Sequence, residues 1–180
     1  MNKGVNIQQL VKLAGAGDRD AFGKLYDTFL DAVYRFVYVR VGNRQDAEDI
    51  TEQIFISMFT AINRYIDNGL PFEAWVYRIA RNKVTDYYRA RKSHIQLDEI
   101  AETVDTRPLP EEQTETNLSK EAVMKSLTHI PSQYQEIIVL KFIEDKTNEE
   151  IGTILEKPIA HIRVLQHRAI QALRKEIQHE

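Results

Sequence analysis

The sequence of 180 residues contains no cysteine. Disulfide bonds, thiol catalysis and cysteine-ligated zinc are therefore excluded, and the composition fits a reducing cytoplasm, where we expect the protein to act. The chain also lacks an apolar run of about 18 residues and has no signal peptide at its N-terminus. We therefore expect no insertion into a membrane.

The usual sequence signatures of catalysis are missing as well. There is no phosphate-binding loop, no H-E-x-x-H motif and no nucleophile with an evident base beside it. The five histidines do not show the spacing of metal ligands. We therefore predict a protein that is not an enzyme and that binds no cofactor and no metal.

The chain carries a small net charge of −3, but its charged residues are unevenly distributed. Residues 1–92 contain 14 basic and 11 acidic residues, whereas residues 119–180 contain nine of each. Between them, residues 93–118 contain one arginine, seven acids, two prolines and few apolar residues. Such a composition is typical of a tether. We predict two domains, 1–92 and 119–180, joined by a flexible acidic linker over 93–118.

Apolar residues recur at helical spacing along the first domain, with no alternating pattern of strands. The predicted helices run from Val5 to Ala16, from Ala21 to Val41, from Asp46 to Tyr65 and from Pro71 to Lys92. Together with the helical spacing in 119–180, this pattern predicts an all-α fold.

Residues that favour helix ends stand between these stretches. Asp18 is the expected N-cap of the second helix, and Gly42 with Asn43 is the expected stop. Asp46 is the expected cap of the third helix. Glu48 and Asp49 then fall in its first turn, where the helix dipole favours acids.

The helix over 71–92 has two contrasting sides. Its apolar side carries Phe72, Val76, Ile79, Ala80, Val84 and Tyr87, with Trp75 at the edge. Its opposite side carries Arg78, Arg81, Asn82, Thr85, Arg89 and Lys92. A solvated face of an ordinary amphipathic helix gives a similar pattern. Four cations without a carboxylate, rimmed by aromatic residues, instead favour a surface for a phosphate backbone and unstacked bases.

The motif F-x-x-W-x-x-R-I-A-R-N-x-x-x-D-Y-x-R at 72–89 resembles the promoter-melting helix of bacterial sigma factors of the extracytoplasmic-function (ECF) group. The G-D-x-x-A-F-x-x-L-Y-D motif at 17–27 also resembles the start of these proteins. The resemblance implies that this segment opens the −10 element and that the loop over 63–70 lines a pocket for a flipped base. The residues it implies for −10 DNA are Asn63, Tyr65, Asn68, Trp75, Arg78, Arg81, Asn82 and Arg89.

The third predicted helix has apolar residues outside its main stripe, at Phe55, Ile56 and Phe59. Deep burial in a bundle and contact with a partner explain this pattern equally well. The segment D-A-E-D-I-T-E-Q-I-F-I-S-M-F at 46–59 is similar to the family segment that docks on core RNA polymerase. The resemblance implies contacts from Asp46, Glu48, Asp49, Glu52, Gln53 and Ile56.

Helical spacing predicts four helices in the second domain. They cover 119–130, begin at Pro131, begin after Thr147, and run from Pro158 to about Gln178. Thr147 and Glu150 form a capping-box pattern. Two helices joined by a tight turn, the second longer, predict a helix-turn-helix. Its last helix turns Ile159, Ile162, Leu165, Ala169, Ile170 and Leu173 inward. Its outward residues, which the resemblance assigns to −35 DNA, are His161, Arg163, Val164, His167, Arg168, Gln171 and Arg174.

The turn of this motif departs from the family pattern. It reads Glu156-Lys157-Pro158, where the family usually has a glycine, and Glu156 near a phosphate is unfavourable. The resemblance implies an ECF sigma factor with core RNA polymerase, promoter DNA and an anti-sigma factor as partners. Two alternatives stay open: a stand-alone helix-turn-helix regulator, and a degenerate sigma-like interaction protein.

Overall fold

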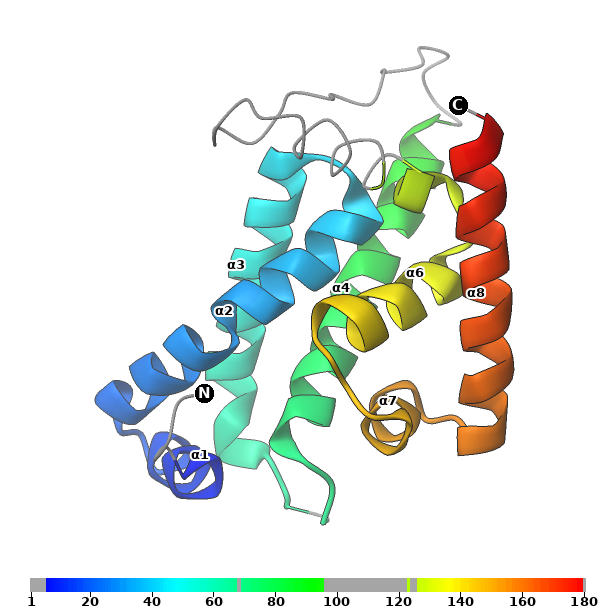
Figure 1. Ribbon diagram of the computed structural model, residues 1–180. Coiled ribbons are helices and arrows are strands. Elements are labelled where there is room, and N and C mark those ends of the chain that lie inside the picture. The colour runs from blue at the N-terminus through cyan, green and yellow to red at the C-terminus, as the bar shows by residue number, and fades with distance from the viewer. Residues whose placement is uncertain (1–5, 68, 96–122, 124–125, 180) are drawn as a thin grey trace, which may run out of the picture.

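A computed structural model of the chain describes residues 6–67, 69–95, 123 and 126–179. These residues form helices and the turns between them, with no strand, which confirms the all-α fold class. An N-terminal bundle and a C-terminal group of helices lie against each other (Figure 1). The predicted acidic linker lies outside the described residues, apart from 93–95, which form the end of the last helix of the bundle.

The N-terminal bundle confirms the helices predicted for the first domain. It consists of α1 (Ile7–Gly15), α2 (Arg19–Val41), α3 (Arg44–Ala61), the short 3-10 helix η1 (Ile62–Arg64) and α4 (Phe72–Ile95).

The ends of α2 follow the sequence signals, but the start of α3 does not. Asp18 caps α2 by accepting a hydrogen bond from the Ala21 N–H at 3.0 Å, and Gly42 ends α2 in the left-handed region at φ 72°. The prediction that Asp46 caps α3 was wrong. Asn43 is the cap, because the helix begins immediately after Gly42, and its Oδ1 accepts from the Asp46 N–H at 3.0 Å. Glu48 and Asp49 therefore lie beyond the first turn.

The core of the bundle lies between α2, α3 and α4, because each helix turns an apolar stripe towards the other two. On α4 the predicted apolar side is confirmed: Phe72, Val76, Ala80 and Val84 are buried, while Trp75, Ile79 and Tyr87 are partly buried against the core. Sequence reasoning missed Tyr77. It is 1% exposed and packs edge-on to Phe36, with ring centroids 5.1 Å apart.

The C-terminal group contains the predicted helix-turn-helix, formed by its last two helices. It consists of α6 (Ser132–Ile138), the π-helical η2 (Val139–Ile143), α7 (Asn148–Leu155) and α8 (Ile159–His179). The helix expected over 119–130 is described only in part, and residues 123 and 126–129 are helical there. The prediction that Ile159 faces inward was wrong. It is 38% exposed because it begins α8 beyond the turn, and the core starts one turn later at Ile162.

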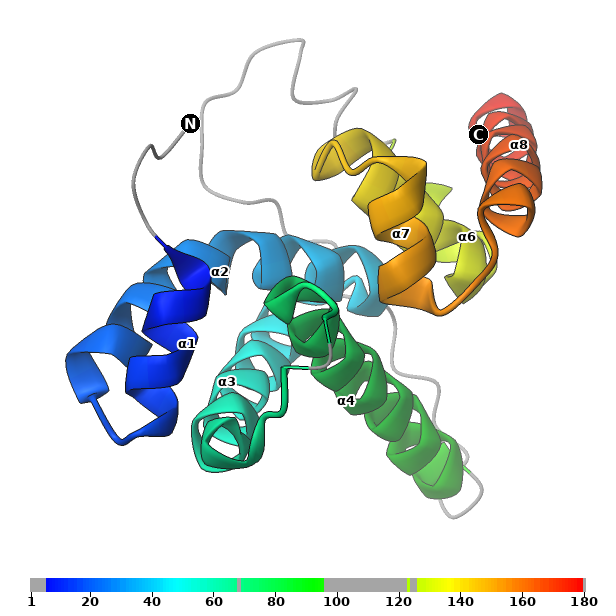
Figure 2. The same ribbon diagram turned by 90° about the horizontal axis from the view of Figure 1, so that it is seen from below.

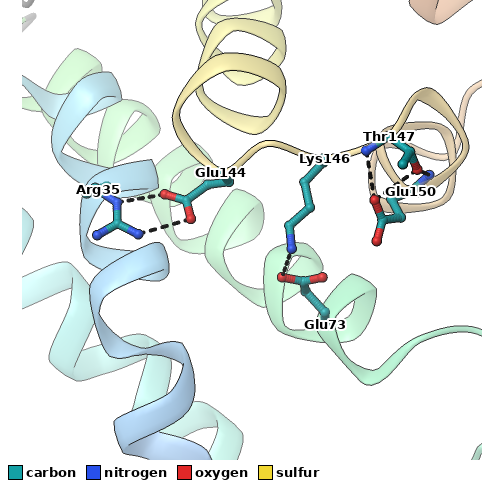
Figure 3. Close-up of polar contacts among 6 residues, drawn as sticks. All are labelled: Arg35, Glu73, Glu144, Lys146, Thr147 and Glu150. Carbon is teal, nitrogen blue, oxygen red and sulfur yellow. Dashed lines mark hydrogen bonds and ion pairs between the residues drawn. The ribbon is translucent and has the colours of Figure 1, made fainter. Parts of the chain in front are cut away.

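The turn between α7 and α8 is tight and depends on local backbone contacts. At the start of α7, Thr147 and Glu150 form the predicted capping box (Figure 3). At its end, Glu156 adopts the left-handed conformation at φ 55°, and the Lys157 N–H donates to the Gly152 carbonyl at 2.9 Å. A Cβ atom on Gly152 would lie 2.9 Å from the Lys157 carbonyl oxygen, so this position accommodates only glycine without a shift of the backbone.

Contacts between the two groups of helices bring distant parts of the chain together. Helix α7 contacts α4, and both α6 and η2 contact α2 (Figure 2). The side of α4 that sequence analysis assigned to DNA therefore lies next to the helix-turn-helix.

Candidate functional site

The polar side of α4 is solvent-facing and collects cations, as predicted. Arg78, Asn82 and Arg89 are exposed, and Arg81 is half-buried. Arg89 makes an ion pair of 3.2 Å with Asp86 of its own helix, and both side chains are largely exposed. Such a pair is weak in water, so Arg89 is available to an anionic ligand. The side chain of Lys92 lies outside the described residues.

A cavity of about 1030 Å³ lies beside the N-terminal end of α4. It is lined by α1, α2, η1, the loop before α4 and the first residues of α4, and it opens to solvent. Asn63 and Tyr65, both predicted for base capture, line it, whereas Asn68 lies outside the described residues. Trp75 is not part of the lining, but its ring packs on Tyr65, with ring centroids 5.3 Å apart and an interplanar angle of 61°. This arrangement offers an aromatic face and an amide to a flat, polar guest.

Helix α1 also contributes to this cavity, which sequence reasoning missed. Gln8 and Lys12 of α1 line it together with Gly15. The amphipathic pattern of α1 indicates which of its residues are buried. It does not indicate that the loop before α4 lies beside this helix. A contact between segments more than fifty residues apart leaves no local signal.

A second hollow of about 470 Å³ lies between α2 and α3 and is mainly apolar. Its residues are Phe22, Tyr26, Leu30, Tyr34, Glu48, Thr51, Glu52, Phe55, Ile56 and Phe59. Ile56 and Phe59 are 55% and 50% exposed, an unusual degree for large apolar side chains clustered at one place. Of the two explanations left open for Phe55, burial in the bundle is the correct one, because Phe55 is only 4% exposed and packs on Tyr26.

The residues predicted for polymerase divide into three groups around this hollow. Glu48, Glu52 and Ile56 line it. Asp49 and Gln53 are exposed on the same helix outside the hollow. Asp46 is half-buried and accepts a hydrogen bond of 2.7 Å from the Tyr87 hydroxyl. This hydrogen bond links α3 to α4, and burial together with the carboxylate raises the pKa of Tyr87 to about 12.

The outer face of α8 carries the residues predicted for the −35 element. All are exposed: His161, Arg163, Val164, His167, Arg168, Gln171 and Arg174. On the inner side Gln166 donates to the Asn148 side chain at 2.6 Å, which ties α8 to the start of α7. The face is therefore supported from its inner side and open to solvent.

Acidic residues of the C-terminal group reach the cations of the bundle, a relationship that no sequence pattern indicated. Glu136 of α6 accepts from Arg81 at 3.1 Å and from Arg40 at 2.9 Å. Glu156 pairs with Arg78. Arg35 makes a bidentate pair with Glu144, at 2.7 and 3.0 Å, and Lys146 lies 2.8 Å from Glu73 (Figure 3).

Comparison with protein families matches two segments of the chain. The Sigma-70 region 2 model matches residues 25–94, and the Sigma-70 region 4 model matches residues 126–175.

None of the described helices is long and apolar enough to cross a bilayer.

Curated relatives agree with these matches along most of the chain. The ECF RNA polymerase sigma factor SigW of Bacillus subtilis is 33% identical over 181 residues, which covers 95% of this chain and 96% of that protein. The ECF RNA polymerase sigma factor BldN of Streptomyces coelicolor is 32% identical over 169 residues. That match covers 93% of this chain but 64% of the longer relative.

Solved structures with the same fold include two proteins in complex with a partner. CnrH in complex with the cytosolic domain of CnrY has a TM-score of 0.71 at 22% identity, over 95% of this chain and 96% of that one. The sigma factor RpoE of Bartonella quintana, crystallised with the anti-sigma factor NepR, has a TM-score of 0.72 at 19% identity. It covers 87% of this chain and 96% of its own.

Proposed function

Because the chain belongs to the sigma-70 family, as a member of its ECF group, we propose that it directs core RNA polymerase to promoters through three surfaces. The observation that carries the proposal is the cationic side of α4 on the same helix whose N-terminal end borders a cavity lined by Tyr65 and Asn63. The cations bind the backbone, and the cavity accepts a base that has left the stack.

The first surface is the hollow between α2 and α3, which we assign to core polymerase. Exposed Ile56 and Phe59 supply an apolar centre, and Glu48, Asp49 and Glu52 supply a charged rim. An apolar centre with a polar rim is the usual anatomy of a specific protein interface. The partner is therefore expected to offer apolar side chains bordered by basic ones.

The second surface melts DNA at the −10 element. Opening a duplex loses base pairs and stacking, and this loss is offset only if the separated strand gains comparable contacts. Arg78, Arg81 and Arg89 neutralise phosphates of the opened strand, and Tyr65 stacks on a captured base. Asn63 offers a donor and an acceptor to the edge of that base.

The third surface is α8, which lies in the major groove at the −35 element. A recognition helix contacts base edges with its N-terminal half, where Arg163, Val164 and His167 are exposed. Arg174 lies further along the helix and is expected to reach only the backbone. Arginine pairs with the O6 and N7 atoms of guanine, and the methyl groups of valine suit the methyl group of thymine.

The protein supplies binding energy and no catalysis, because the polymerase itself performs phosphoryl transfer. It acts in the cytoplasm, where polymerase and promoters are found. We also infer an anti-sigma partner. Two proteins of the same fold, CnrH and RpoE, have been solved in complex with the cytosolic domain of CnrY and with the anti-sigma factor NepR, respectively.

Reconstitution with core polymerase tests the proposal. The purified full chain should form a stable complex with core enzyme and produce discrete run-off transcripts from a genomic library. Thymines of the selected promoters should become reactive to permanganate in the bubble. If the chain instead binds duplex DNA with sequence preference alone and gives no transcripts with core enzyme, the stand-alone regulator is the correct assignment.

A further inference from the structure

We propose that Asp46 and Tyr87 are positioning residues for DNA opening: together they hold the C-terminal part of α4, which carries Arg89, in the orientation that binds the opened strand. The proposal rests on the function proposed above, because it takes the cationic side of α4 as the DNA surface. Asp46 thereby serves the DNA surface and not, as the family resemblance implied, the contact with core polymerase.

The C-terminal part of α4 has few apolar contacts with the rest of the bundle. Among residues 72–91, Val84 is the last that is buried. Of residues 85–91, Tyr87 is partly buried and the others are exposed. The hydrophobic effect therefore fixes the helix as far as Val84 and contributes little beyond it. A helix end of this kind opens locally unless polar contacts hold it.

The hydroxyl of Tyr87 provides the first of these polar contacts. It donates to Oδ2 of Asp46 at 2.7 Å and accepts from Nη1 of Arg91 at 2.9 Å. Asp46 lies in the first turn of α3, so the contact joins the end of α4 to the start of α3. The carboxylate and the guanidinium polarise the hydroxyl from both sides, which strengthens both hydrogen bonds. Since the pKa of Tyr87 is raised to about 12, the hydroxyl remains a donor at physiological pH.

Tyr88 provides a second contact, to a different helix. Its hydroxyl donates to the main-chain carbonyl of Arg40, in the last turn of α2. The rings of Tyr87 and Tyr88 pack edge-on, with centroids 5.3 Å apart and an interplanar angle of 72°. Consecutive side chains on a helix point about 100° apart, so the two hydroxyls hold α4 from two directions. With either contact alone the helix end can pivot, whereas the two together fix its direction.

Arg89 receives its orientation from this arrangement. It follows Tyr87 by two residues, which places the two side chains about 200° apart around the helix. Tyr87 therefore faces α3, while Arg89 faces solvent and makes only a weak, exposed pair with Asp86. A guanidinium that is already positioned loses less conformational freedom when it binds a phosphate, so it binds more tightly.

The surroundings of Asp46 differ from those of the acids at the polymerase surface. Its carboxylate is half-buried and bonded to Tyr87, and Asp46 does not line the hollow between α2 and α3. Glu52, by contrast, is exposed, lines that hollow and makes no ion pair among the described residues. A partner that recruited Asp46 would have to break its bond to Tyr87, whereas Glu52 is free to pair.

Hydrogen exchange on the free full chain tests whether these contacts hold the helix end. Tyr87→Phe keeps the ring and removes the hydroxyl, and Asp46→Asn keeps the size and removes the charge. Amides of residues 85–91 should exchange faster in both variants, and those of 72–84 should not change. Tyr38→Phe is the matched control, because Tyr38 is a half-buried tyrosine of the same bundle whose hydroxyl makes no hydrogen bond among the described residues. Unchanged exchange over 85–91 in both variants overturns the proposal.

Binding measurements separate the DNA surface from the polymerase surface. Asp46→Asn and Tyr87→Phe should bind labelled core polymerase as tightly as the unchanged chain, whereas Glu52→Lys should bind it more weakly. The complexes of the first two variants with core enzyme should bind a promoter recovered from the run-off library about two- to tenfold more weakly, the loss expected when one arginine must be ordered on binding. Weakened core binding by Asp46→Asn with unchanged promoter binding assigns Asp46 to polymerase and overturns the proposal.

A double-mutant cycle with Arg89→Ala distinguishes positioning from a purely structural role. Tyr87→Phe should weaken promoter binding much less in a chain that already carries Arg89→Ala, because the hydroxyl acts through that arginine. Equal losses with and without Arg89 indicate a purely structural role and overturn the proposal. If the unchanged chain itself forms no complex and no transcript with core enzyme, the proposed function fails instead, so the two failures are told apart.

Discussion

The Oε1 atom of Glu136 lies 2.9 Å from Nη1 of Arg40, so a carboxylate of the C-terminal domain neutralises a guanidinium buried in the N-terminal domain. Burial lowers the pKa of Arg40, and Glu136 opposes this effect. The Nε of Arg40 has no hydrogen-bond partner among the described residues, so Glu136 is its main compensation. The two domains are therefore coupled through a buried ion pair to which each domain contributes one charge.

Replacing Glu136 with alanine should uncouple the domains. A buried charge left unpaired destabilises by about 3–5 kcal/mol, but separation of the domains allows water to reach Arg40 and limits the loss. We expect calorimetry to show two thermal transitions for Glu136→Ala and one for the Glu149→Ala control. A single transition at a much lower temperature would show that the domains stay docked with Arg40 unpaired and unfold together.

Replacing Ile56 with glutamate should weaken binding to core polymerase without unfolding the bundle. The side chain is 55% exposed, so a charge there costs little in the free chain, whereas it would be desolvated in the interface. Loss of a central apolar contact is expected to lower affinity about thirtyfold or more. Titration of labelled core enzyme measures this, with Gln178→Glu as a control of equal charge change. Unaltered affinity would assign the hollow to another partner.

The arginines of α4 should differ between the free chain and the holoenzyme. In the holoenzyme, alanine at Arg78, Arg81 or Arg89 should each reduce the slope of log affinity against log salt by about 0.7–0.9, the value for one phosphate contact. In the free chain only Arg89→Ala should do so, because the other two are engaged by glutamates. Permanganate footprints as strong in all three variants would show that the face is merely solvated.

Two arginines of α8 separate base reading from backbone binding. Arg163→Ala should relax the preference at one −35 position, with a loss of about 1–3 kcal/mol of discrimination. Arg174→Ala should weaken binding to all sequences alike. Selection from a randomised −35 library with each holoenzyme measures both. A uniform loss in both variants would mean that this domain only anchors, and that promoter choice depends on α4 and its loop.

The capping box of α7 makes a pH-dependent contribution to stability. Hydrogen bonds from the Thr147 backbone and hydroxyl lower the pKa of Glu150 below its ordinary 4.5. The stabilisation is therefore present above that pKa and is lost as pH falls through the lower value in the folded chain. The melting temperature of Glu150→Gln should depend less on pH than that of Glu149→Gln between about pH 5 and pH 3. Parallel pH profiles would exclude this role.

Local sequence signals predicted the parts of the fold that depend on near neighbours. The helical spacing of Val76, Ala80 and Val84 identified the buried side of α4, and Thr147 with Glu150 identified the start of α7. The cap of α3 failed because Asn43 and Asp46 are both good caps. The deciding factor was how soon the chain re-enters a helix after Gly42, which composition does not show.

Long-range relationships were beyond sequence reasoning for a different reason. Glu136 and Arg81 are 55 positions apart, and the pattern of each helix shows only its own polar side and not the partner it meets. The same holds for α1. Its Gln8 and Lys12 line the cavity beside α4 only because the chain brings the loop before α4 next to α1. The family resemblance supplied candidate DNA contacts, but it did not show that some of those contacts are engaged within the chain.

The left-handed Glu156 has a consequence for how this chain can change over generations. Either glutamate codon becomes a glycine codon by one base substitution, so the relaxed turn is always a single mutation away. A lineage under selection for stability alone would take that step readily. A random-mutagenesis screen for thermal stability is therefore expected to return Glu156→Gly at this codon, because glycine adopts the left-handed conformation without steric cost.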